Sequence, residues 1–186
     1  MAHNYYYFIA SLPYINYGDK PPVSSEEFRE QCRNFLTKSD AALLRYCYYD
    51  SKLAMETEKS TGSAFIDLLM HRQRILGLTL AKLRAARLKV PGPEEEASQD
   101  IPRVIAAAKA AFDMDDPLAA ELSLDRARWS VLDEMVGTNY FGVNNIYAYL
   151  MKLQLLERKQ SFNEALGFTE YRNIYDTILH DYNSRS

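Results

Sequence analysis

Apolar side chains recur every three or four residues along most of this chain, a spacing that places them on one face of an α-helix. The longest such segment, from Ala64 to about Lys89, contains no proline and would be about 40 Å long as a helix. No stretch shows the convincing alternation of a half-buried strand. The pattern therefore predicts an all-α bundle of about seven helices with one long central helix. The apolar face of that helix is expected to consist of Phe65, Leu68, Leu69, Leu76, Leu80 and Leu83.

The amino-terminal part of the chain contains one ambiguous segment and two expected helix starts. Residues 5–12 are apolar throughout, so periodicity does not distinguish a buried strand from a buried helical turn. Ser24 with Glu27 three residues later forms a capping box, which predicts a helix that ends near Thr37. Ser39 is the next candidate N-cap.

Capping signals also mark helix starts in the second half of the chain. Asp116 precedes Pro117, and proline is favoured at the first position of a helix. Asn144 or Asn145 is expected to begin the following helix. These two helices are expected to end near Gly137 and Arg158, and further helices are expected over Asp100–Ala111, Ser161–Gly167 and Thr169–Leu179.

Residues 90–100 are predicted to form a flexible linker within a single helical domain that spans residues 1–186. Pro91, Gly92 and Pro93 end the long helix, and three glutamates follow them. These carboxylates are also placed to fold back on the basic side chains of the long helix.

The composition fits a globular domain. Of the 186 residues, 47% are hydrophobic, enough to fill a core, and 25% are charged, an average share. The net charge of -3 gives no overall attraction to nucleic acid. No apolar run approaches the ~20 residues that span a bilayer, and no signal peptide is visible. We therefore expect a cytoplasmic location without direct membrane insertion.

Residue types that often carry catalysis or bind metals occur here without the required spacings. His3, His71 and His180 form no ligand pattern such as HExxH. No glycine-rich phosphate loop and no GxSxG motif is present. Cys32 and Cys47 lie 15 residues apart without a nearby histidine and are expected to be buried thiols. We expect no enzymatic activity, no cofactor and no functional metal.

The long helix carries an excess of positive charge. Phe65–Lys89 holds six lysines and arginines but only one acid, Asp67. No helix-turn-helix, zinc finger or aromatic-interleaved module accompanies these cations, so we expect no nucleic-acid partner. Either acids of the same chain neutralise them, or they contact an acidic protein partner. The residues expected to bind such a partner are Arg72, Arg74, Arg84 and Arg87.

The aromatic residues indicate core anchors and one recognition loop. The chain holds 14 tyrosines, amphipathic side chains that suit half-buried helix contacts and partner surfaces. Trp129 is expected in the core, and so are Tyr147, Tyr149 and Tyr140-Phe141. The loop Tyr14–Asp19 is a candidate recognition loop, because its aromatics are not all expected to be buried.

Four segments spread over the chain carry a family resemblance. They are Tyr6–Pro13, Arg74–Arg87, Leu124–Trp129 with Leu132–Glu134, and Ala148–Arg158. Taken together and in this order, they resemble an uncharacterised bacterial family whose genes tend to lie among those of V-type ATPase subunits. That family is in turn similar to the C subunit of archaeal-type rotary ATPases, the d subunit of eukaryotic ones. Gly77 and Lys159-Gln160 depart from the family pattern, and this chain is much shorter than such a subunit.

The resemblance implies a function. The C (d) subunit is an all-helical socket that joins the central stalk to the membrane ring. The resemblance therefore implies a non-catalytic subunit or assembly factor of a V/A-type rotary ATPase, with stalk subunits as protein partners and a peripheral position at the inner face of the plasma membrane. It supplies no catalytic residues. The residues alone leave open a stand-alone helical adaptor, or a small-molecule-binding protein, unrelated to the ATPase.

Overall fold

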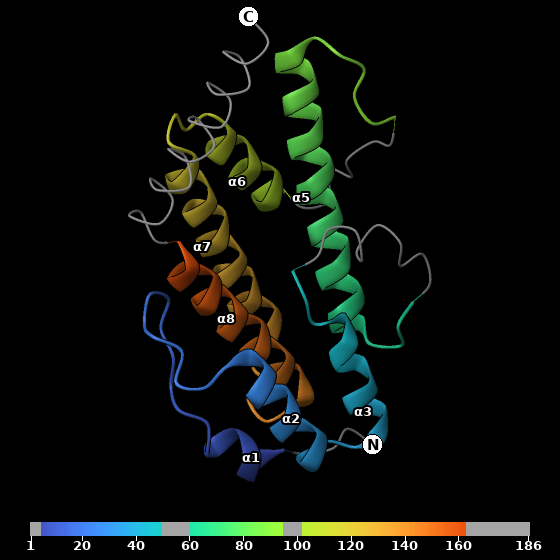
Figure 1. Cartoon of the computed structure of the whole chain (residues 1–186). Coiled ribbons are helices and arrows are strands. Elements are labelled where there is room, and N and C mark those ends of the chain that lie inside the picture. Colours follow the sequence, from blue (N-terminus) through green and yellow to red (C-terminus); the bar gives the residue numbers. More distant parts are fainter. Residues whose placement is uncertain (1–4, 50–59, 95–101, 163–186) are drawn as a thin grey trace, which may run out of the picture.

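A computed structural model describes residues 5–49, 60–94 and 102–162 of the chain (Figure 1). Within these ranges the protein has seven α-helices, one 3₁₀ helix and no strand, which confirms the predicted all-α fold. The elements are α1 (Tyr6–Ala10), α2 (Ser25–Phe35), α3 (Lys38–Leu43), the 3₁₀ helix η1 (Leu44–Tyr46), α5 (Ala64–Leu88), α6 (Pro102–Phe112), α7 (Pro117–Val136) and α8 (Val143–Ser161).

Two hydrophobic clusters hold these helices together. The larger one surrounds α8, whose apolar residues are almost all fully buried, and α2 and α7 pack against that helix. The smaller cluster lies where α5, α6 and α7 meet, and its centre includes Leu76, Val104 and Leu124. Helix α5 contributes to both clusters, with Phe65 and Leu69 in the larger and Leu76 in the smaller. The long helix therefore connects the two halves of the core (Figure 1).

Helix α5 has the predicted length but not the predicted buried face. The Ser63 hydroxyl accepts a hydrogen bond from the Ile66 N–H at its start, and Lys89 ends it in the left-handed conformation, with φ at 58°. Leu68 is 40% exposed, and Leu80 is only half-buried. Residues not assigned to the face are buried instead, namely Ile66, Met70, Ile75 and Leu78. A single stripe fails here because the amino-terminal part of α5 packs in the larger cluster and its middle packs in the smaller one, whereas its carboxyl end is largely exposed.

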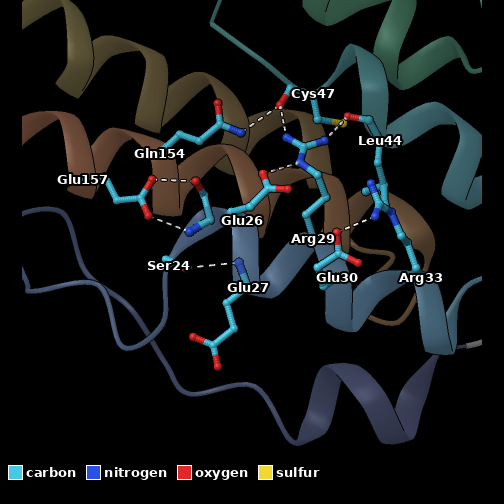
Figure 2. Close-up of polar contacts among 11 residues, drawn as sticks. Ser24, Glu26, Glu27, Arg29, Glu30, Arg33, Leu44, Cys47, Gln154 and Glu157 are labelled. Carbon is cyan, nitrogen blue, oxygen red and sulfur yellow. Dashed lines mark hydrogen bonds and ion pairs between the residues drawn. The ribbon is translucent and has the colours of Figure 1, made fainter.

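The predicted start of α2 is confirmed, and that of α3 is corrected. The Ser24 hydroxyl accepts a hydrogen bond from the Glu27 N–H at 3.1 Å, which is the N-cap bond of a capping box (Figure 2). The N-cap of α3 is Thr37 rather than Ser39, and its hydroxyl accepts from the Asp40 N–H at 3.2 Å. Both residues have the hydroxyl that a cap needs, and the earlier end of α2 at Phe35 leaves Thr37 in the extended conformation that an N-cap adopts.

The start of α7 is also confirmed. Asp116 is its N-cap and accepts from the Leu118 N–H at 2.9 Å, with Pro117 at the first position and Gly137 at the end. By contrast, α8 begins at Val143, so Asn144 and Asn145 lie inside its first turn and cap nothing. The Asn145 side chain instead donates to the Asn139 carbonyl at 2.7 Å, which stabilises the preceding turn.

The remaining sequence expectations have mixed outcomes. The ambiguous apolar segment at residues 5–12 forms the short helix α1. The alanine-rich helix is α6, but its expected cap, Asp100, lies outside the described residues. Most of the expected linker, at residues 95–100, also lies outside them, as do the predicted helix Thr169–Leu179 and the Glu164 partner of Ser161.

Arg29 in α2 is a buried charge that ties three elements together. Its guanidinium donates hydrogen bonds to the carbonyl oxygens of Leu44 at 2.5 Å and Cys47 at 3.3 Å. The Cys47 carbonyl also accepts from the Gln154 side chain of α8 at 2.8 Å, as Figure 2 shows. Since a buried hydrogen-bonded charge is expensive to unpair, Arg29 fixes α2 to the segment that follows α3, and Gln154 joins α8 to the same segment.

Both cysteines are buried free thiols, as the sequence predicts. Burial raises the pKa of Cys32 and that of Cys47 to about 12. The thiolate is the reactive form, and an unfolded thiol has a pKa near 8.5. We therefore expect the folded protein to react with a disulfide reagent at about pH 8 more than a hundredfold more slowly than the protein in denaturant. Stopped-flow absorbance measures both rates, and a fast native phase for either thiol would contradict this expectation.

Candidate docking surface and arginine pocket

The four arginines predicted to bind a partner lie in two separate places on α5. Arg84 and Arg87 are exposed near its carboxyl end, whereas Arg72 and Arg74 are half-buried nearer its middle. Arg72 and Arg84 are about 18 Å apart along the helix at 1.5 Å per residue. The four side chains therefore do not form one continuous surface.

The carboxyl end of α5 carries a surface that is both basic and apolar, here called the α5-end surface: Arg84, Arg87, Leu88, Lys89 and Val90. Leu88 is 71% exposed and Val90 is 52% exposed. Arg84 makes no hydrogen bond or ion pair with a described residue. Arg87 does have an internal contact, because its guanidinium lies 4.0 Å from the centre of the Phe112 ring. Figure 1 shows this end of α5 at the opposite end of the molecule from α1, α2 and α3.

A shallow groove of about 430 Å³ adjoins this surface between α5, the end of α6 and the start of α7. Arg84 and Arg87 form one wall, and the rest is lined by Phe112, Pro117 and other apolar side chains together with one acid, Glu121, which pairs with Arg158 at 2.6 Å. The sequence suggested that acids after the long helix neutralise its charge. Glu94, the one acid of that run within the described residues, forms no ion pair there. The positive charge at this end of α5 therefore faces outward.

Arg72 lies in a different environment, a pocket of about 200 Å³ between α5, α6 and α7, here called the arginine pocket. Its floor is apolar and includes Leu69, Leu76, Val104 and Leu124. Its polar lining is Tyr49, Arg72, Gln73, Arg103, Arg128, Ser130 and Glu134. Leu69 belongs to the larger hydrophobic cluster and the other three floor residues to the smaller or its edge, so the pocket is the gap where the two clusters meet.

Several polar atoms in the arginine pocket are buried without a hydrogen-bond partner. They are Nε of Arg72, Nε of Arg128 and the hydroxyl oxygen of Tyr49. Burial, and then the nearby charge of Arg103, lower the pKa of Arg72. Burial raises the pKa of Tyr49, which keeps its phenol protonated and able to donate. An unsatisfied buried donor costs about 1–3 kcal/mol, and these three groups have no acceptor although the lining also contains Glu134.

Charge is only partly balanced in the arginine pocket. Arg103 pairs with Glu134, and Arg128 donates to Asp125 at 2.5 Å. Arg72 forms no ion pair or hydrogen bond with a described residue. The lining formed by the described residues has three arginines and one acid, Glu134, and Asp125, which is not part of the lining, pairs with Arg128.

A buried ion network lies next to the pocket, between α7 and α8. Asp125 is completely buried and accepts from Arg128 and also from Arg158 of α8 at 3.2 Å. Arg158 pairs in addition with Glu121 at 2.6 Å. This network was not expected from the sequence pattern. Because Asp125 and Arg128 are one helical turn apart, their pairing was visible in the sequence, but the contribution of Arg158 was not.

The predicted core aromatics are partly confirmed. Trp129 is 8% exposed and Tyr147 is completely buried, whereas Tyr140 and Phe141 are exposed, which corrects that expectation. These two rings lie in the turn between α7 and α8, which contacts the start of α1: the Tyr5 N–H donates to the Phe141 carbonyl at 3.0 Å, and the ring centres of Tyr6 and Phe141 are 4.7 Å apart. Tyr140 and Phe141 line a third hollow of about 520 Å³, the aromatic groove, together with Tyr14. Tyr14 is 87% exposed, consistent with a recognition role for the Tyr14–Asp19 loop.

Part of the chain is similar to a known protein family. Residues 107–182 match the model of a family described as "Protein of unknown function (DUF2764)". This stretch includes the end of α6, all of α7 and α8, and therefore Asp125, Arg128 and Glu134. Helix α5, with the predicted partner-binding arginines, lies outside it. The description of the family names no activity or partner, and neither the curated proteins nor the solved structures contain a match.

The described residues contain neither a metal-binding cluster nor a membrane-spanning helix. No group of three or more histidine, cysteine or acidic side chains among them is placed to hold a metal ion. No helix among them is long and apolar enough to cross a membrane. The expected lack of a functional metal and of enzymatic activity stays a prediction.

Proposed function

We propose that this protein is a non-catalytic subunit or assembly factor of a V/A-type rotary ATPase, with a stalk role similar to that of the C (d) subunit. The proposal starts from the four-segment resemblance. The observation that supports a docking role is the α5-end surface, where arginine side chains that pair with no acid among the described residues adjoin exposed Leu88 and Val90. The partner is an ATPase stalk subunit that presents an acidic, partly apolar surface.

The physical argument rests on what a protein interface needs. Interfaces combine an apolar centre with a charged or polar rim, and arginine is enriched in them. Leu88 supplies exposed apolar area, and Arg84 beside it supplies a charge that pairs with no acid among the described residues. Charge complementarity of this kind raises the association rate and is weakened by salt. Arg72 and Arg74 are excluded from this surface by position, so the docking role falls to the carboxyl end of α5.

The test is co-purification with the ATPase peripheral sector from cells that express the protein at its native level. Arg84→Glu with Leu88→Glu changes two exposed side chains and should leave the helical circular-dichroism spectrum and the thermal midpoint unchanged. We expect recovery with the ATPase to fall at least about tenfold, because a repelling charge and a lost apolar contact act together. The matched control is Arg45→Glu, the same charge change at an exposed arginine of η1.

Salt dependence separates the two contributions. The single variant Arg84→Glu should show its defect mainly at low ionic strength. At an ionic strength of about 0.1 M, screening already limits the range of interactions between exposed charges to about 10 Å. The single variant Leu88→Glu should retain a defect at high salt as well, since it removes apolar contact area. Recovery of the double variant at the wild-type yield would overturn the proposal.

A specific observation favours one alternative, a stand-alone helical adaptor unrelated to the ATPase. The aromatic groove presents Tyr14 and Tyr140, exposed by 87% and 63%, at the end of the molecule away from the α5-end surface. If this alternative holds, no ATPase subunit co-purifies with the wild-type protein, and Tyr14→Ala with Tyr140→Ala abolishes capture of its partner.

A further inference from the structure

The arginine pocket combines two features that seldom occur together inside a helical bundle. Its floor is built from aliphatic side chains of two hydrophobic clusters, whereas its lining holds three arginines. A cavity of about 200 Å³ with aliphatic walls resembles in size the cavities that hold benzene in engineered proteins. Packing alone therefore leaves room for a compact apolar group of about that size.

The polar atoms define what else the ligand must carry. The unpartnered atoms of Arg72 and Arg128 are N–H donors, and the protonated Tyr49 hydroxyl is a donor too. Donors of this kind, on cations without sufficient acids, are satisfied by an anion with several acceptor oxygens. A cationic ligand is disfavoured, because it would lie beside three guanidinium groups.

We propose that the arginine pocket binds a small carboxylate with a compact apolar body, and that Arg72 holds the carboxylate. The apolar body lies on Leu76 and Leu124, and the carboxylate faces the donors of Arg72 and Tyr49. A bare inorganic anion leaves the aliphatic floor empty, and a neutral aromatic leaves the arginine donors unsatisfied. Both therefore bind more weakly than a molecule with the two parts. Because the pocket is lined by α5, α6 and α7, a bound ligand also ties these three helices together.

The experiment uses the full-length protein and three probes: phenylacetate, its neutral counterpart phenylacetamide, and acetate. Calorimetry or ligand-observed NMR gives the affinities, and thermal unfolding gives the stabilisation. We expect phenylacetate to bind at least about tenfold more tightly than either of the others. At a concentration of about ten times its dissociation constant, it should raise the thermal midpoint by about 2–6 °C.

Three variants connect the binding to the pocket. Arg72→Gln removes the charge and should weaken phenylacetate binding at least about tenfold, bringing it close to the value for phenylacetamide. Ala107→Leu places a larger side chain at a half-buried position in the pocket wall and should abolish binding of both aromatic probes while the fold is kept. Lys109→Gln, on the exposed side of α6, makes the same change of charge outside the pocket and should leave the affinity unchanged.

Three results would overturn the inference. They are absence of phenylacetate binding at about 10 mM, equal affinity for phenylacetamide, and equal affinity for acetate. Binding that survives Ala107→Leu would place the ligand elsewhere and would also overturn it. None of these results depends on the ATPase, so this inference and the proposed docking function succeed or fail separately.

Discussion

Replacing Leu153 by aspartate is expected to abolish the native fold. Leu153 is completely buried in α8, at the centre of the larger hydrophobic cluster. The substitution loses about 1.5–3 kcal/mol of apolar burial. It also places a carboxylate in an apolar environment, at a further cost of several kcal/mol. Since domains are stable by only about 5–15 kcal/mol, the variant should show no cooperative thermal transition by circular dichroism.

Two leucines of α5 provide graded controls for this prediction. Leu68 belongs to the face that the sequence predicts to be buried, yet it is 40% exposed, so Leu68→Asp should cost no more than about 1 kcal/mol. Leu80 is half-buried, and Leu80→Asp should be intermediate, with a folded but less stable protein. A Leu68→Asp variant as damaged as Leu153→Asp would contradict the described packing of α5.

Removal of the Asp125 carboxylate is expected to have the second-largest effect, a loss of about 3–5 kcal/mol in the free energy of unfolding for Asp125→Ala. The residue is fully buried and accepts hydrogen bonds from Arg128 and Arg158. Without it, two guanidinium groups lose their shared acceptor, and among the described carboxylates Glu121 alone still pairs with Arg158. Urea unfolding measures the loss, with the midpoint expected to fall and the slope unchanged.

The matched control for Asp125 is Asp133, another α7 aspartate that pairs with a cation of α8. Its side chain is 56% exposed where it contacts Lys152. Exposed pairs contribute about 0–1 kcal/mol, so Asp133→Ala should change stability by no more than that. Equal effects of the two substitutions would show that the Asp125 network is no stronger than an ordinary surface pair.

Local features of the fold could be predicted from the sequence because they depend on residues close together in the chain. The Ser24 cap of α2 and the Asp116-Pro117 start of α7 each require hydrogen bonds across three residues or fewer. Period and length alone indicated the all-α class and the extent of α5. The predicted helix starts at Ser39 and at Asn144 are wrong by two residues. These errors are also local, since a nearby residue was able to begin the helix.

The functional surfaces were decided by tertiary structure. The sequence grouped Arg72 with Arg84 because both are arginines of one helix. The packing of α6 and α7 encloses Arg72 but leaves Arg84 at the exposed end of α5. Arg103 and Arg128, which complete the arginine pocket, lie 31 and 56 positions after Arg72 in the chain. Asp125 likewise meets Arg158 across 33 positions. A sequence pattern reports which residues share one helix face, whereas a pocket or a buried ion network depends on which faces of different helices meet, and that is set by how the whole core packs.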